Sequence, residues 1–98
     1  IDGNGNRVAA LIYGPEGVVV VVGINKIAPD VQSALMRARN LAAPTNSQRF
    51  NINTPCKING ACANCKCPDS ICAQINFTRL CKPQGRIKVI IVTKELGF

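Results

Sequence analysis

The sequence predicts an α/β fold in which a sheet of buried strands packs against at least one helix. Residues 18–24 and 86–93 form two runs that are rich in β-branched residues and have the length of strands. The first run is apolar throughout, which is typical of a strand that helices cover on both faces. Between the two runs, apolar residues recur at helical spacing. In a chain of 98 residues these features predict one small domain, residues 1–98.

Two strands and a helix are expected in the first half of the chain. Residues 7–13 form a short apolar run, and turn residues 14–17 separate it from the run at 18–24, an arrangement that suits a hairpin. Pro29 and Asp30 then give a helix-start signal. The apolar face of this helix consists of Val31, Ala34, Leu35, Ala38, Leu41 and Ala42. Pro44 is expected to end or kink the helix.

The second half is expected to contain a long irregular loop followed by two strands. Residues 51–72 are turn-prone and rich in cysteine. A loop of this length in a compact domain is usually functional or held in place by a bound group. Residues 73–80 alternate with a period of two, which predicts a half-buried strand, and a turn at 83–85 leads into the apolar run at 86–93.

The net charge of +7 comes from twelve Lys and Arg residues against five acids, and these basic residues are scattered along the chain. Nucleic-acid binders cluster their basic residues and interleave aromatic ones, so the pattern predicts a solvated basic surface and no nucleic-acid partner. The longest apolar stretch, residues 18–22, is too short to cross a bilayer, and no signal peptide is visible. The turn-forming start, without Met, is expected of a fragment.

Six cysteines and the absence of histidine are the clearest chemical feature of the chain. Cys62 and Cys65 form the best metal-binding element, because two intervening residues let both sulfurs reach one ion from a tight turn. Cys56 and Cys72 approach from either side, and Cys67, which precedes a proline, is an alternative ligand. An all-thiolate set suits a zinc ion or an iron–sulfur cluster.

Two other interpretations of the cysteines stay open on the residues alone. Six cysteines permit fifteen disulfide pairings, although the aliphatic core pattern is unlike that of disulfide-held scaffolds. The thiols could also be reduced and packed as small apolar groups, an interpretation that suits Cys81 best.

A second candidate site follows the first apolar strand. Gly23, Ile24, Asn25 and Lys26 lie between this strand and the helix, where open α/β sheets bind their ligands. Backbone N–H groups and Lys26 could receive an anion there, although an ordinary strand–helix loop is the favoured interpretation. Without histidine or paired carboxylates, the sequence names no catalytic residue.

With these residues in hand, the chain resembles the C-terminal part of the LUD domain family, which is linked to lactate utilisation. The resemblance rests on several blocks in order. They are residues 5–10, 23–27 and 42–46, Pro55-Cys56, Gly60-x-Cys62-x-x-Cys65, Pro68-Asp69-x-Ile71-Cys72, residues 85–87 and residues 95–98.

The resemblance implies a fold similar to the NagB/RpiA/CoA-transferase-like α/β domains, in a cytoplasmic protein of a prokaryote. It also implies that this chain is the later part of the domain, so that the N-terminal part of the same domain is its first partner. The family pattern has cysteines at Cys56, Cys62, Cys65 and Cys72, which makes Cys67 and Cys81 bystanders. Iron–sulfur partner proteins accompany the better-known members.

Three hypotheses result. The first is a LUD-type segment with a four-cysteine site for an iron–sulfur cluster or a zinc ion, together with a redox partner protein. The second is a ligand-binding half of an enzyme, in which Asn6, Arg7, Asn25 and Lys26 bind an organic acid or a phosphate-bearing substrate. The third is a redox-sensing thiol cluster without metal. No membrane partner is expected, and a homo-oligomer is compatible with all three.

Overall fold

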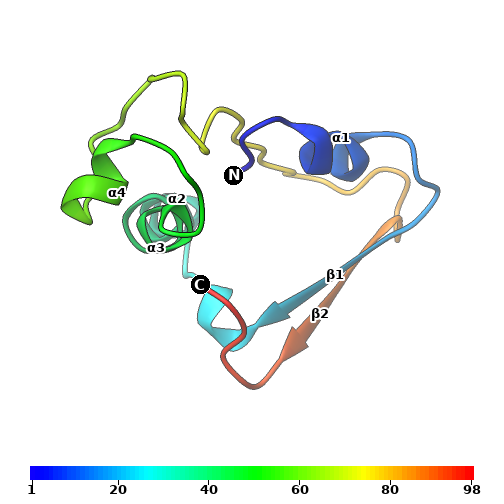
Figure 1. Cartoon of the computed structure of the whole chain (residues 1–98). Helices are drawn as coiled ribbons and strands as arrows, with labels where there is room; N and C mark the ends of the chain where they lie inside the picture. The colour runs from blue at the N-terminus through cyan, green and yellow to red at the C-terminus, as the bar shows by residue number, and fades with distance from the viewer.

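The computed structural model describes residues 1–98 and shows a mixed fold of helices and a small parallel sheet (Figure 1). The elements in chain order are α1 (Asn6–Ile12), β1 (Val18–Gly23), the 3-10 turn η1 (Ile24–Lys26), α2 (Val31–Arg37), the π-helical segment η2 (Ala38–Ala42), α3 (Ala43–Ser47), α4 (Pro55–Asn59) and β2 (Ile87–Val92). The expected combination of strands and at least one packed helix is therefore confirmed.

The two strongest strand predictions are also confirmed, and the two strands pair with each other. β1 and β2 run parallel, in a register that places Val18 opposite Ile87 and Gly23 opposite Val92. The connection between them carries the helices α2 to α4 and all six cysteines. Parallel neighbours need such a long crossover, because a tight turn can join only antiparallel strands.

The predicted first strand at residues 7–13 is wrong, since these residues form α1. The carboxylate of Asp2 accepts hydrogen bonds from the backbone N–H groups of Arg7 (3.0 Å) and Val8 (3.2 Å), which satisfies two free donors at the helix start. At the other end, Arg86 donates to the carbonyl groups of Ala10 and Leu11. The local contacts of Asp2 and the long-range contacts of Arg86 favour a helix over the expected hairpin.

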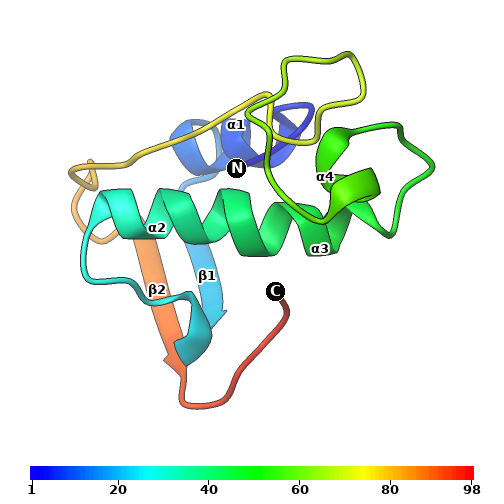
Figure 2. The same cartoon turned by 90° about the vertical axis from the view of Figure 1, so that its left-hand side faces the viewer.

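One long helical rod crosses the molecule beside the sheet (Figure 2). It begins as predicted at Asp30, whose carboxylate accepts a hydrogen bond of 2.6 Å from the N–H of Ser33. Of the two expected effects of Pro44, ending the helix does not occur, because α2, η2 and α3 follow one another without a break. A proline ring clashes with the carbonyl four residues earlier in an α-helix, and the wider π-helical turn before Pro44 accommodates it.

The predicted irregular loop at 51–72 contains the short helix α4. Pro55 occupies its first turn and Gly60, with φ of 72°, ends it, so both signals were present in the sequence. The strand predicted at 73–80 is absent. Only Gln74 bridges to Asp2, and Ile75 and Phe77 remain about 58% and 62% exposed, because no further strand lies beside this segment.

The prediction that β1 is buried on both faces is also wrong for this chain. Val19 and Val21 in β1 are 61% and 58% exposed, and Ile91 in β2 is 53% exposed. Only six of the 98 residues are buried, and five of them lie where α3 meets α4. These five are Ala43, Pro44, Ser47, Thr54 and Cys56.

None of the helices combines the length and the apolar character that crossing a membrane requires.

Candidate metal centre

Four cysteines line one cavity of about 60 Å³ between the long helical rod and the segment that follows it. They are Cys56, Cys62, Cys65 and Cys72, the same four that the sequence predicts as ligands. Arg39, Ala43, Thr54 and Ile71 are among the other lining residues. The cavity thus brings together thiols that span seventeen positions of the chain.

Helix α4 and the turn after it place the first thiols. Cys56 is the second residue of α4 and is buried, with its sulfur 3.3 Å from the hydroxyl oxygen of Thr54. Gly60 ends the helix, and Asn64 adopts a left-handed backbone with φ of 51°. This turn folds Cys62 and Cys65 back toward the same cavity.

The later part of the loop is tied down before it delivers Cys72. The carboxylate of Asp69 accepts a hydrogen bond of 2.8 Å from the N–H of Asn53, which joins the two ends of the segment that carries the cavity. The N–H of Cys72 itself donates to the hydroxyl of Ser70 at 3.3 Å. These contacts hold the loop although it has little regular structure.

The sulfur of Cys62 receives two hydrogen bonds. The N–H of Asn64 donates at 3.4 Å, and the guanidinium Nη2 of Arg39 donates at 3.5 Å. The backbone N–H of Asn64, with a further contribution from Arg39, lowers the pKa of the Cys62 thiol, against the opposing effect of burial. The lowered pKa favours the thiolate form of Cys62, which is the form that binds metals.

Cys72 shows the opposite behaviour for a related reason. Burial raises the pKa of its thiol, and the neighbouring Cys56, Cys62 and Cys65 raise it further. Like charges that approach one another disfavour ionisation. The four thiols are thus within electrostatic reach of one another, so a positively charged group between them would relieve the repulsion.

No three of the chain's cysteine, aspartate or glutamate side chains come close enough to hold a metal ion. Four sulfurs on one tetrahedral zinc lie about 3.8 Å apart, given Zn–S bonds of about 2.3 Å. The thiols instead surround a space of about 60 Å³. Since a single water needs about 10–15 Å³ on the same measure, this space takes about four to six atoms of that size.

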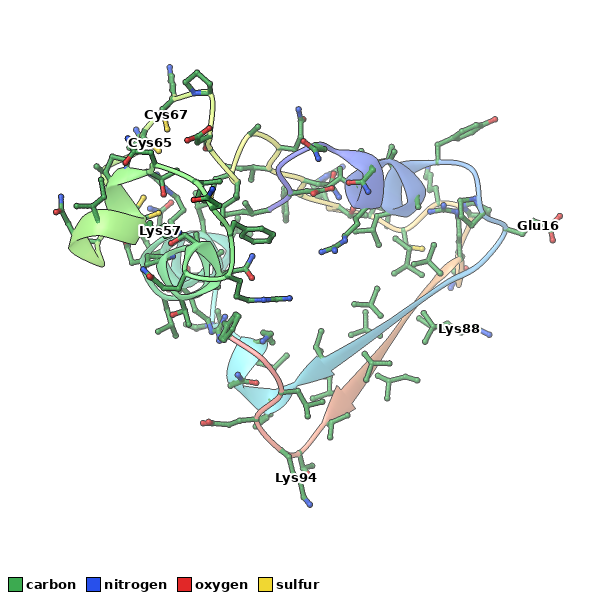
Figure 3. All side chains as sticks on the ribbon, viewed as in Figure 1. Glu16, Lys57, Cys65, Cys67, Lys88 and Lys94 are labelled. Carbon is green, nitrogen blue, oxygen red and sulfur yellow. The ribbon has the colours of Figure 1, made fainter.

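Cys67 and Cys81 do not line this cavity. Figure 3 shows Cys67 next to Cys65 on the outer part of the loop, and partial burial together with a hydrogen bond to Cys65 raises the pKa of the Cys67 thiol. Cys81 lies before β2, with its sulfur 3.3 Å from the carbonyl oxygen of Pro83. All six thiols are free.

The second candidate site is brought together only in part. Arg7 and Lys26 line one cavity of about 450 Å³, but Asn6 and Asn25 do not. Asn25 instead binds the backbone of the last residues, donating to the carbonyl of Gly97 at 3.1 Å. Lys26 donates to the carbonyl of Leu96 at 2.6 Å.

Two arginines of the rod were missed as site residues. Arg39 lines the cysteine cavity, and Arg37 lines the larger cavity beside Arg7 and Lys26. Both lie off the apolar face of the helix, so the sequence pattern assigned them to solvent. Their sequence positions could have indicated this role, because both arginines lie one to two helical turns before Ala43. Ala43 borders both cavities.

The fold and the cavity define a small protein of mixed helices and strands with a cysteine-lined centre. The family model of the LUD domain matches residues 1–92, and the chain therefore belongs to the LUD domain family. No curated protein and no solved structure matches the chain.

Proposed function

We propose that this chain carries the metal centre of a LUD-type protein of lactate utilisation, with an iron–sulfur cluster held by four cysteines. The ligands are Cys56, Cys62, Cys65 and Cys72. The observation that carries the proposal is that these four thiols, and no carboxylate, line a single cavity. Soft thiolate ligands select iron–sulfur clusters and zinc over hard cations.

The size of the cavity favours a cluster over a zinc ion. A cluster distributes its thiolates over several iron atoms, so its ligands stand apart around a multi-atom core. Four thiols that line a space of about 60 Å³ suit such an arrangement. A structural zinc site would require the turn at Cys62 and Cys65 to close further.

The protein's own residues would bind and shield such a group. When bound, an iron–sulfur cluster supplies one-electron transfer. The thiolates attach the loop to the rod at Ala43, and Thr54 donates or accepts at the sulfur of Cys56. A redox partner protein would exchange electrons at the outer side of the loop, where Cys65 and its neighbours are accessible.

The test is metal and acid-labile sulfide analysis, with a visible absorption spectrum, on the anaerobically purified full-length protein. Iron with matching sulfide and a brown colour supports the cluster. Stoichiometric zinc without sulfide supports the same ligands in a structural site and overturns the electron-transfer role. Neither metal, with six titratable thiols, contradicts the proposal and favours the metal-free thiol cluster.

Single replacements identify the ligands. Cys62→Ser is expected to remove most of the bound metal, because each ligand holds part of the centre. Cys81→Ser is the matched control, since its sulfur lies by Pro83 and outside the cavity. Equal losses in both variants would mean that the four ligands are wrongly chosen.

We also propose that the sheet continues beyond this chain, in a fold similar to the NagB/RpiA/CoA-transferase-like domains. Parallel sheets normally have both faces covered, whereas Val19, Val21 and Ile91 are more than half exposed. The occupant that fits is the N-terminal part of the same domain, which would supply neighbouring strands and a covering layer.

A second candidate function is the binding of a small organic acid or phosphate group. Arg7, Lys26 and Arg37 line one cavity of about 450 Å³ that no acidic residue lines. Cys72 borders this cavity and the cysteine cavity alike, so an anion there would lie beside the proposed centre.

Calorimetric titration of the full-length protein with lactate and with inorganic phosphate tests this second function. Arg37→Gln is expected to weaken binding of the anion by removing one of three positive charges. Arg79→Gln keeps the same change of charge outside the cavity and should bind normally. Absence of heat with both anions, or equal affinities for the two variants, contradicts the anion site.

A further inference from the structure

We propose that Arg39 is a positioning residue of the cysteine centre, which fixes the Cys62 sulfur and sets the reduction potential. The inference rests on the proposed iron–sulfur function. Arg39 is the single basic side chain that lines the cysteine cavity. Its guanidinium donates to the Cys62 sulfur at 3.5 Å.

The rod places Arg39 toward the cysteines. Arg39, Ala43 and Ser47 follow one another at four-residue spacing and therefore lie along one side of the rod. Ala43 and Ser47 are buried where α3 meets α4. Their small side chains let the cysteine segment approach closely, and the long side chain of Arg39 reaches the sulfur one turn earlier.

The backbone around Arg39 is unusual. Arg39 is the second residue of η2, the π-helical segment Ala38–Ala42. Single π-helical turns within α-helices are rare and occur frequently at functional sites. Here the turn lies directly beside the cavity, so the same feature that accommodates Pro44 also presents the guanidinium.

Charge gives Arg39 its role. Four thiolates around a core of formal charge about +2 leave a net charge of about −2, and no other basic side chain lines the cavity to offset it. Reduction adds a further negative charge, which a nearby guanidinium and hydrogen bonds to sulfur stabilise. Arg39 is therefore expected to raise the reduction potential and to strengthen binding of the centre.

The chain offers a matched control. Arg49 is also an arginine near the end of the rod, but its guanidinium donates to Asn46 at 3.1 Å and lies over the ring of Phe50. It does not line the cysteine cavity. Arg49→Gln thus removes the same charge from the same region without touching a sulfur.

The experiment compares wild type, Arg39→Gln, Arg39→Lys and Arg49→Gln as anaerobic full-length proteins. The readouts are iron and sulfide content, competition with a chelator, and a potentiometric titration. We expect Arg39→Gln to bind the centre about 10- to 100-fold more weakly and to show a lower potential. Arg39→Lys should keep part of the potential, because the charge remains without the planar fork.

The outcomes separate the two proposals. If wild type holds the cluster but Arg39→Gln equals Arg49→Gln in affinity and potential, the role of Arg39 is overturned and the centre stands. If wild type holds no cluster, both are overturned. If Arg39→Gln does not fold, the comparison of Arg39→Lys with Arg49→Gln decides, and equal potentials in those two variants overturn the role.

Discussion

At the scale of single residues, hydroxyl groups occupy the most deeply buried positions. Ser47 is 0% and Thr54 is 1% exposed. Each finds a local partner: the Ser47 hydroxyl donates to the carbonyl of Pro44 at 2.6 Å, and the Thr54 oxygen lies 3.3 Å from the Cys56 sulfur. The core beside the cysteine cavity is therefore small and satisfied by hydrogen bonds.

Thr54→Val tests the contact with Cys56. Valine keeps the shape but removes the hydroxyl, so we expect a loss of about 0.5–1.5 kcal/mol in the free energy of unfolding. Urea unfolding of the full-length protein measures it. Thr93→Val, at an exposed position, serves as the control and should change little. Equal stabilities for the two variants would show that the contact contributes nothing.

At acidic pH, the stability of the start of α1 depends on the ionisation of Asp2. Its hydrogen bonds from Val8 and then Arg7 lower its pKa from the ordinary 3.8, with burial opposing. Because the pKa is lower in the folded state, the stabilisation is fully present above the unfolded pKa and is lost as the pH falls through the folded value. We expect the start of α1 to fray below about pH 4.

Amide exchange at Arg7 and Val8 measures this effect. In wild type, protection at these two amides should fall as the pH drops below about 4, after correction for the intrinsic exchange rate. Asp2→Asn should show weaker protection at neutral pH and little further change with acid. An identical pH profile in the variant would rule out Asp2 as the cause.

The spacing of the cysteines and the family resemblance together singled out the four thiols that line the cavity. The same reasoning missed Arg39, because an arginine off the apolar face of a helix has the pattern of a solvated side chain. Its contact with Cys62 joins residues 23 positions apart. Such a contact depends on how the loop folds back over the rod, which local pattern does not encode.

At the scale of elements, the sequence indicates the ends of helices well where a capping residue, a proline or a glycine lies at the end. Asp30 caps the rod as predicted, and Pro55 and Gly60 mark the limits of α4. Residues 7–13 failed because their alanines and leucine suit a helix as well as a strand. Contacts from Asp2 and Arg86, at opposite ends of the sequence, decide between the two structures.

Among the glycines, Gly23 leaves the least room for a side chain. A Cβ atom there would lie 2.4 Å from the backbone nitrogen of Leu96 and 2.7 Å from the carbonyl of Lys94. We therefore expect Gly23→Ala to displace the final segment and to cost about 1–3 kcal/mol. Gly17→Ala is the control, since its Cβ would meet nothing within 4 Å. Thermal unfolding should separate the two variants clearly, and coincident midpoints would contradict the steric explanation.

At the scale of the whole molecule, both strands of the sheet expose large apolar side chains. Lys88 points away from the helices (Figure 3), and the two-residue period of a strand puts Val89 and Ile91 on the opposite face. These two side chains are 58% and 53% exposed as well. The positions of the two strands were predicted correctly, whereas the predicted burial of β1 on both faces was wrong, because these 98 residues do not cover the sheet on both faces.

Hydrogen exchange of β1 and β2 tests whether the rest of the domain covers them. The amides of Val19 and Val21 should exchange much more slowly in the full-length protein than in the chain of residues 1–98. The isolated chain should also associate as its concentration rises, and Val21→Lys should reduce this association. Equal exchange rates in the two proteins would exclude an intramolecular cover and favour pairing between copies.

The parallel pairing of β1 with β2 has a consequence for the cysteine centre. Val18 and Ile87 are partners in the sheet, so everything between them, including all the thiols, forms one closed loop. A centre that joins Cys56 to Cys72 divides this loop and removes part of the entropy that its closure costs. If the proposed centre forms, its assembly and the pairing of β1 with β2 therefore stabilise each other, and removal of the bound group would weaken the strand pairing.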